Sequence, residues 1–223
     1  MERNVTYLPQ NSQTKINTNI KNFIFDLGAV IIDLDYSVTA KAFAVLSGKT
    51  EKEIEAFYQS TDAFLKYEKG MISDDEFRTM LRSYLGKQLT DGSLDTAWNA
   101  MLGDLPMQRL ELLSMLRNQY KVYVLSNTNA IHIKAFNKIL NQASGKTDLF
   151  DFADDVFYSH ILQLRKPDVE IYEAVIRLTG INPAESLFMD DKKENLLGAE
   201  SVGIQTKHIT TPNQILELEE YVG

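Results

Sequence analysis

The chain has 223 residues, of which 44% are hydrophobic and 24% are charged, proportions ordinary for a globular protein with one main core and a smaller accessory domain. It contains no cysteine, which excludes disulfide bonds, thiolate metal ligands and a cysteine nucleophile. The formal net charge of −8 argues against nucleic acid and anionic membranes as partners, because phosphate backbones are bound by basic surfaces.

The first twenty residues are polar, rich in Asn, Gln and Thr, and they predict a loosely held tail (residues 1–20). They lack the basic and apolar stretches of a signal peptide. No apolar run approaches the roughly 20 residues that are needed to cross a bilayer. We therefore expect a soluble, cytoplasmic protein without a membrane partner, either a monomer or a homodimer.

An apolar run follows at residues 22–32 and predicts a buried strand that ends at Asp26. Residues 37–104 then have helical periodicity throughout, with no strand-like alternation. Two capping boxes, Thr50–Glu53 and Ser73–Glu76, indicate helix starts in this block. Because the block interrupts the chain directly after one strand, we expect it to be an inserted, all-helical cap with a small core of its own.

From Pro106 onward the predicted strands and helices alternate. Strands are expected at 121–127, 156–159, 186–191 and 203–209, and helices at 106–119, 129–142, 167–179, 193–203 and from 211. Such alternation is typical of a parallel sheet with right-handed crossovers. The predicted fold class is therefore α/β, with a Rossmann-like parallel-sheet core (residues 21–36 and 105–223) and a helical cap (residues 37–104).

Polar residues follow three predicted strands at their carboxyl ends, and a lysine precedes a predicted helix: Asp26, Ser126–Asn127, Asp190–Asp191 and Lys166. Ligands of open α/β sheets bind beyond the carboxyl ends of the strands, so we expect these residues to meet. Together they supply a carboxylate nucleophile, a hydroxyl donor, a cation and a carboxylate pair. Phosphoryl transfer to a carboxylate needs this set, with Mg²⁺ as the oxygen-bound cofactor.

Four strings, FDLGAVIID, LSN, RKPD and FMDDKKEN, resemble in this order the four motifs of the haloacid dehalogenase (HAD) superfamily, over about residues 22–210. The helical block resembles the cap of subfamily I, which lies between the first two motifs. Within the superfamily the chain looks most similar to α-D-glucose-1-phosphate phosphatase-like members. The resemblance implies a Mg²⁺-dependent phosphatase that acts through an aspartyl phosphate on a small sugar or metabolite phosphate, such as a sugar 1-phosphate.

The resemblance also implies the residues of a metal site. Asp26 would be both the nucleophile and a Mg²⁺ ligand, and the backbone carbonyl of Gly28 would be a second ligand. Asp191 would bind the metal directly, and Asp190 directly or through water. Asn195 would support this site.

A further set of residues would hold the phosphoryl group. The resemblance assigns this role to the Ser126 hydroxyl, the Asn127 backbone and the Lys166 ammonium. The catalytic residues would then be Asp26, Ser126 and Lys166.

One position departs from the HAD pattern. Gly28 stands where the superfamily usually has the aspartate that acts as general acid and base, a role that typically contributes about 10²–10⁴-fold to the rate. Its loss favours leaving groups that carry negative charge well, such as the anomeric oxygen of a sugar 1-phosphate. Three other positions each allow two interpretations. Asp33 could be an alternative acid or a loop-capping residue, and His132 could contact the substrate or be a packed residue. Glu68–Gly70 could be a substrate-facing loop or a plain helix end.

Two other functions stay open. The glycine at 28 allows a non-catalytic module that binds a phosphometabolite or a protein partner. A haloacid dehalogenase would use the same Asp26 against carbon, but it needs no metal, and the carboxylate pair Asp190–Asp191 argues against it. A response-regulator receiver would be shorter and would have no cap.

Overall fold

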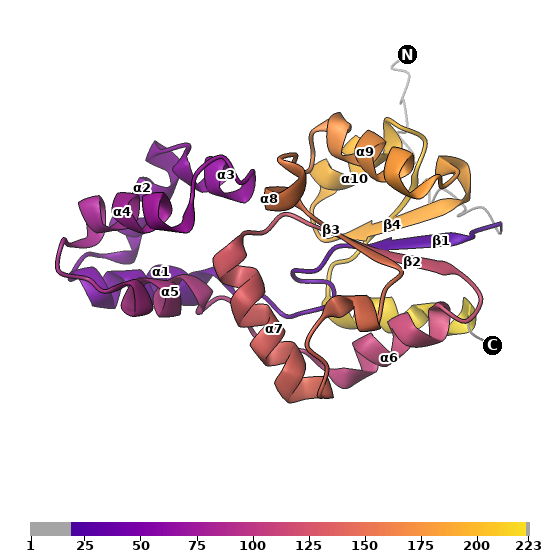
Figure 1. Ribbon diagram of the computed structural model, residues 1–223, viewed down its shortest axis with the longest axis horizontal. Helices are drawn as coiled ribbons and strands as arrows, with labels where there is room; N and C mark the ends of the chain where they lie inside the picture. Colours follow the sequence, from indigo (N-terminus) through magenta and orange to yellow (C-terminus); the bar gives the residue numbers. More distant parts are fainter. Residues whose placement is uncertain (1–18, 222–223) are drawn as a thin grey trace, which may run out of the picture.

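The computed structural model describes residues 19–221, which form an α/β core with a helical cap beside it (Figure 1). Five parallel strands make one sheet in the order β3-β2-β1-β4-β5. They are β1 (Asn22–Phe25), β2 (Lys121–Ser126), β3 (Asp155–Tyr158), β4 (Ser186–Asp190) and β5 (Gln205–His208). This arrangement confirms the predicted Rossmann-like α/β fold class.

Helices cover both faces of the sheet (Figure 1). Phe23 and Phe25 of β1 enter one core, and Ile24 between them enters the other. The first core is closed by α6 (Met107–Leu116), α7 (Ala130–Ser144), η1 (Leu149–Asp151) and η3 (Pro212–Tyr221). The second is closed by α9 (Val169–Thr179) and α10 (Lys193–Glu200), with α8 (Ser159–Leu162) and η2 (Pro183–Glu185) as short connections. Burial on both faces explains the continuous apolar runs of the strands.

The cap consists of five helices that lie beyond the carboxyl ends of the strands (Figure 1). They are α1 (Tyr36–Ser47), α2 (Glu51–Ser60), α3 (Ala63–Glu68), α4 (Asp74–Leu85) and α5 (Asp91–Asn99). Both predicted capping boxes are present, at the starts of α2 and α4. The helices share an apolar core rich in aromatic rings, as expected for an inserted cap. The exact division at residues 37–104 stays a prediction.

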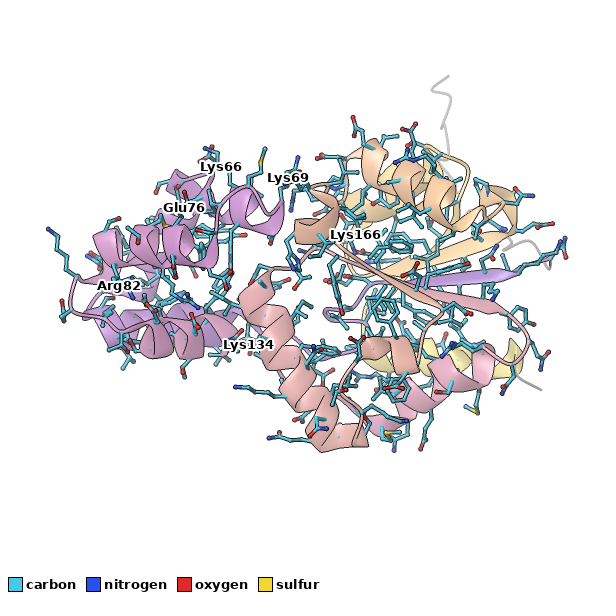
Figure 2. The ribbon with its side chains drawn as sticks, viewed as in Figure 1. Lys66, Lys69, Glu76, Arg82, Lys134 and Lys166 are labelled. Carbon is cyan, nitrogen blue, oxygen red and sulfur yellow. The ribbon has the colours of Figure 1, made fainter. Side chains whose placement is uncertain are left out.

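Two ion pairs join the cap to the core. Glu68 at the end of α3 lies 3.1 Å from the guanidinium of Arg165, and Lys69 lies 2.8 Å from the carboxylate of Asp168. Figure 2 shows Lys69 at the end of the cap that faces the core. Both partners of each pair are partly exposed, so each contributes at most about 1 kcal/mol to stability. They are better suited to aligning the cap than to holding the fold together.

Gly70 allows a close approach at the same junction. A Cβ atom there would lie 2.1 Å from the carbonyl oxygen of His160, and the φ angle of 62° is left-handed. Segment Glu68–Gly70 therefore ends a helix at the junction with the core, and the substrate-facing role offered for it stays a prediction.

Several boundaries differ from the predictions. Most of the predicted tail (residues 1–20) lies outside the described residues, but Ile20 is buried in the first core. Helix α9 begins at Val169 rather than at Pro167, and α10 ends at Glu200 rather than at residue 203. The predicted terminal helix is present as the 3₁₀ helix η3. Within residues 19–221, no helix combines the length and the apolar composition needed to cross a membrane.

Candidate active site

Strand order and register bring the predicted site residues together. In the parallel sheet, Phe25 of β1 pairs with Val124 of β2 and with Met189 of β4. Asp26 directly follows β1, and its neighbours at the same sheet edge are the ends of β2 and β4. Ser126 and Asp190 are the last residues of those two strands. The sheet therefore places a nucleophile candidate between a hydroxyl and a carboxylate.

Lys166 reaches this edge from the loop before α9, and its side chain is fully buried. Its ammonium donates to Asp26 Oδ1 at 2.8 Å, to Asp190 Oδ2 at 2.7 Å and to the Leu125 carbonyl at 2.8 Å. Burial alone would lower its pKa, but the carboxylates of Asp190 and Asp26 outweigh that and raise the pKa above the ordinary value. All three donors of the ammonium are thus used, and the lysine is charged.

Asn127 holds the Lys166 loop in place. Its side-chain amide donates to the Lys166 carbonyl at 2.8 Å and accepts from the Lys166 N–H at 2.9 Å. The side chain is therefore fully occupied in joining β2 to this loop. Only the backbone of Asn127 is left to contact a phosphoryl group, the part of the residue to which the sequence resemblance assigned that role.

The two carboxylates after β4 have different surroundings. Asp190 is completely buried, and it accepts from Lys166, from the Asn195 amide at 2.8 and 3.0 Å, and from the Lys192 N–H at 2.8 Å. Asp191 is half-buried and forms no ion pair with any residue between 19 and 221. Asp190 is thus fixed as the partner of Lys166, whereas the Asp191 carboxylate is open.

The carboxylates form a cluster that fits a hard divalent cation. Oxygen atoms of Asp26, Asp190 and Asp191 lie within 4.8 Å of one another. Asp26 and Asp190 both contact the single buried ammonium of Lys166, and Asp191 adds a third carboxylate that this lysine does not pair with. Burial and the nearby Asp190 raise the pKa of Asp191. An oxygen-only ligand set with this charge suits Mg²⁺.

A positive charge at this cluster would favour the ionised form of Asp26. Its burial raises its pKa to about 7; Lys166 opposes the rise, and the carboxylates of Asp190 and Asp191 add to it. The Leu27 N–H donates to Asp26 Oδ1 at 2.7 Å and favours the ionised form. A cation bound at this cluster would favour it further and keep the nucleophile available at neutral pH.

At position 28 the space beyond the backbone is filled by another residue. A Cβ atom on Gly28 would lie 2.4 Å from the Leu34 side chain. Asp33, the alternative acid, instead pairs with Arg109 Nη1 at 2.7 Å, and it is not among the cavity-lining residues. This pair with Arg109 of α6 fits the loop-bonding role offered for Asp33, and the acid role stays untested.

A cavity of about 520 Å³ begins at these residues and extends into the cap. His132 forms part of its wall, with Nδ1 2.8 Å from Asn99 Oδ1 and its ring stacked 4.6 Å from that of Trp98. Burial lowers the pKa of His132 to about 3, so its ring is neutral at physiological pH. His132 is therefore a packed residue that also lines the cavity.

Sequence reasoning missed three residues around this cavity. Tyr36 and Lys192 both line it, and the Lys192 ammonium lies 5.5 Å from the centre of the Tyr36 ring. Ser159 is buried at the junction; its hydroxyl oxygen accepts from the Thr128 N–H at 2.9 Å and lies 2.7 Å from the Glu68 carbonyl. The position of Ser159, as the polar last residue of the predicted strand 156–159, was the signal that could have identified it.

Several known phosphatases and HAD family enzymes are similar to this chain. The D-ribitol-5-phosphate phosphatase of Bacteroides thetaiotaomicron is 32% identical over 84% of this chain and 90% of its own length. The sesquiterpene phosphatase of Aspergillus oryzae is 30% identical over 92% of this chain and 98% of its own. A solved HAD family enzyme of Bacteroides thetaiotaomicron, in complex with magnesium and inorganic phosphate, is 38% identical with a TM-score of 0.78, covering 85% of this chain and 93% of that one.

These findings confirm the predicted superfamily and the predicted enzyme class, a HAD-type phosphatase. The magnesium in the similar solved structure and the oxygen-only cluster of this chain both support Mg²⁺ as the cofactor. The narrower resemblance to glucose-1-phosphate phosphatases stays a prediction. The model of the haloacid dehalogenase-like hydrolases matches residues 20–203, and the chain belongs to that family.

Proposed function

We propose that the protein is a Mg²⁺-dependent phosphomonoesterase that acts on small metabolite phosphates through an aspartyl phosphate on Asp26. The observation that carries this proposal is the buried ammonium of Lys166 between Asp26 and Asp190, at 2.8 and 2.7 Å, with the unpaired Asp191 beside them. A structural ion pair would need only one carboxylate. Three clustered carboxylates, of which Asp26 lines the cavity, suit a site that binds a cation and an anion together.

In the first step an Asp26 carboxylate oxygen attacks phosphorus, and the bond from phosphorus to the alcohol oxygen breaks. Lys166, Ser126 and the Asn127 backbone would hold the phosphoryl oxygens as their charge changes. Water then hydrolyses the acyl phosphate to release phosphate and restore Asp26. Mg²⁺ held by Asp26, Asp191 and the Gly28 carbonyl would supply the positive charge that lets two anionic groups approach.

The substrate alcohol is less defined than the reaction. The two similar phosphatases are named for alcohols of very different polarity, a pentitol and a sesquiterpene. Gly28 adds a leaving-group argument, because without an acid at this position a hemiacetal oxygen should leave more easily than a primary alkoxide. The measurement is kcat/KM for glucose 1-phosphate against glucose 6-phosphate. A preference for the 6-phosphate would contradict this argument without affecting the proposed reaction.

The reaction itself is tested at the nucleophile. Asp26→Asn should abolish hydrolysis of p-nitrophenyl phosphate while the circular dichroism spectrum stays unchanged. Beryllofluoride should form a stable adduct with the wild type only. The matched control is Asp33→Asn, which changes a carboxylate on the same loop that pairs with Arg109, outside the cavity lining. Undiminished turnover by Asp26→Asn would refute the mechanism, and a wild type that binds phosphate but turns over no ester would favour the binding-module alternative.

A further inference from the structure

The cavity has two chemically different ends. One end is formed by the charged and polar residues of the core, Asp26, Ser126 and Lys166. From there the space continues among the cap helices, where carbon atoms make up most of its wall. Its volume of about 520 Å³ far exceeds what a phosphate group needs and lies in the range of ligand pockets.

The cap end is lined by large apolar side chains from α1, α2, α3, α4 and α5. The most buried of them are Phe43, Ile54, Phe64, Leu81, Leu85 and Trp98, each no more than 7% exposed. They belong to the core cluster of the cap, so the cavity opens into the apolar interior of the cap itself. An apolar space of this size loses dispersion contacts unless something fills it.

Two polar side chains of the cap wall, those of Trp98 and His132, already have partners. Trp98 Nε1 donates to Asn129 Oδ1 at 3.4 Å, and His132 Nδ1 lies 2.8 Å from Asn99 Oδ1. Glu55, Tyr58 and Gln59 of α2 add polar groups to another part of the wall. A polyol placed beside Phe43 and Trp98 would lose water at several hydroxyls and find few partners in exchange. An apolar group would lose nothing and would bury carbon surface.

We propose that the cap cavity binds the alcohol part of the substrate, and that this part is apolar, as in a long-chain alkyl or terpenyl monophosphate. This inference rests on the proposed phosphatase function and specifies its substrate class. The phosphate would lie at the core end, with the hydrocarbon chain extending between α1 and α5 toward Phe43 and Trp98.

The test uses n-alkyl monophosphates from ethyl to decyl, because their leaving groups are alike and only the hydrocarbon length changes. We expect kcat/KM to rise by up to about fourfold per methylene until the cavity is filled. Glucose 6-phosphate, also a primary alkyl ester, should be a poorer substrate than octyl phosphate by about 100-fold or more.

Two alanines on α1 provide matched variants. Ala40 lines the cavity, whereas Ala44, one turn further on, packs against the same cap core and is not among the lining residues. Ala40→Leu should reduce kcat/KM for octyl phosphate about tenfold more than it reduces that for ethyl phosphate. Ala44→Leu should leave both unchanged, and melting temperatures show whether each variant folds.

The outcomes separate this inference from the proposed function. Hydrolysis of ethyl phosphate with a flat response to chain length would overturn the apolar substrate class and leave the phosphatase intact. A rise with chain length that Ala40→Leu does not reduce would place the hydrocarbon elsewhere and also overturn the proposal. If no alkyl or activated aryl phosphate is hydrolysed, the proposed function itself fails.

Discussion

The core end and the cap end of the cavity offer different kinds of interaction to a ligand. At the core end a few atoms matter, and each has a defined partner, such as the three acceptors around the Lys166 ammonium. At the cap end many carbon atoms each contribute a small dispersion contact, and none of these contacts depends on a particular direction. Reaction chemistry therefore depends on particular residue types at particular strand ends, whereas substrate choice depends on volume and polarity, which many residue combinations can provide.

The largest effect should follow from removing the central cation. Lys166→Met leaves Asp26 and Asp190 buried without their ammonium, so we expect loss of activity by about 10³-fold. The free energy of unfolding should also fall by about 3–5 kcal/mol, because a buried charge loses its partner. Steady-state rates and urea unfolding measure the two effects. The control is Lys134→Met, an exposed lysine of α7 (Figure 2), which should change neither. Full activity in Lys166→Met would show that the reaction at the core end does not depend on this particular residue.

The metal requirement should separate the two neighbouring carboxylates. EDTA should stop turnover, and added Mg²⁺ should restore it. Asp191→Asn should raise the Mg²⁺ concentration for half-maximal rate at least tenfold, because an open carboxylate ligand is lost. Asp190→Asn should shift that concentration less, and it should lower kcat and stability because Lys166 loses a partner. Equal Mg²⁺ curves for the two variants would contradict this division of roles, and activity that withstands EDTA would contradict the metal site.

The boundary between the two ends can be probed at Gly28. Gly28→Asp alone requires the Leu34 side chain to move, because the new Cβ would lie 2.4 Å from it. In the double variant Gly28→Asp/Leu34→Ala, the carboxyl group has room to protonate the leaving oxygen. The kcat/KM ratio of glucose 1-phosphate to glucose 6-phosphate should then fall by about tenfold. Leu34→Ala alone is the control and should leave the ratio unchanged. A similar ratio in all four proteins would show that the acid position does not set the leaving-group preference.

The smallest effect concerns His132, on the cap side of the cavity. Its pKa is about 3 in the folded protein, against 6.5 in an unfolded chain, so between these values the unfolded state binds the extra proton. Stability should therefore be lost as pH falls below about 6.5, by at most about 1.4 kcal/mol per pH unit from this residue. His132→Phe keeps a ring against Trp98 but cannot titrate.

Urea unfolding of both proteins at about pH 8 and about pH 5.5 measures this difference. The variant should be the less stable at the higher pH, because it loses the hydrogen bond to Asn99, and the gap should narrow or reverse at the lower pH. A constant gap would show that His132 does not titrate on unfolding in this range.

The sequence by itself determined the class of fold and the reaction type. Alternating apolar runs and helical periods depend on hydrogen bonding and burial within one element, and they predicted the parallel sheet and the inserted helices. The capping boxes at Thr50–Glu53 and Ser73–Glu76 are local in the same sense. The site motifs could be read because each follows a strand, and strand ends meet at one edge of a parallel sheet.

Only the tertiary structure decided which of these residues pair. Asp190 and Asp191 are adjacent in sequence, yet one turns toward Lys166 and Asn195 and the other stays open. The Asn127 side chain is occupied by the Lys166 backbone, 39 residues away. Leu34 fills the space beside Gly28, a contact set by how the loop enters the cap. The apolar extension of the cavity likewise depends on how five cap helices pack against one another. Long-range packing and register leave no local pattern, so these features required the folded chain.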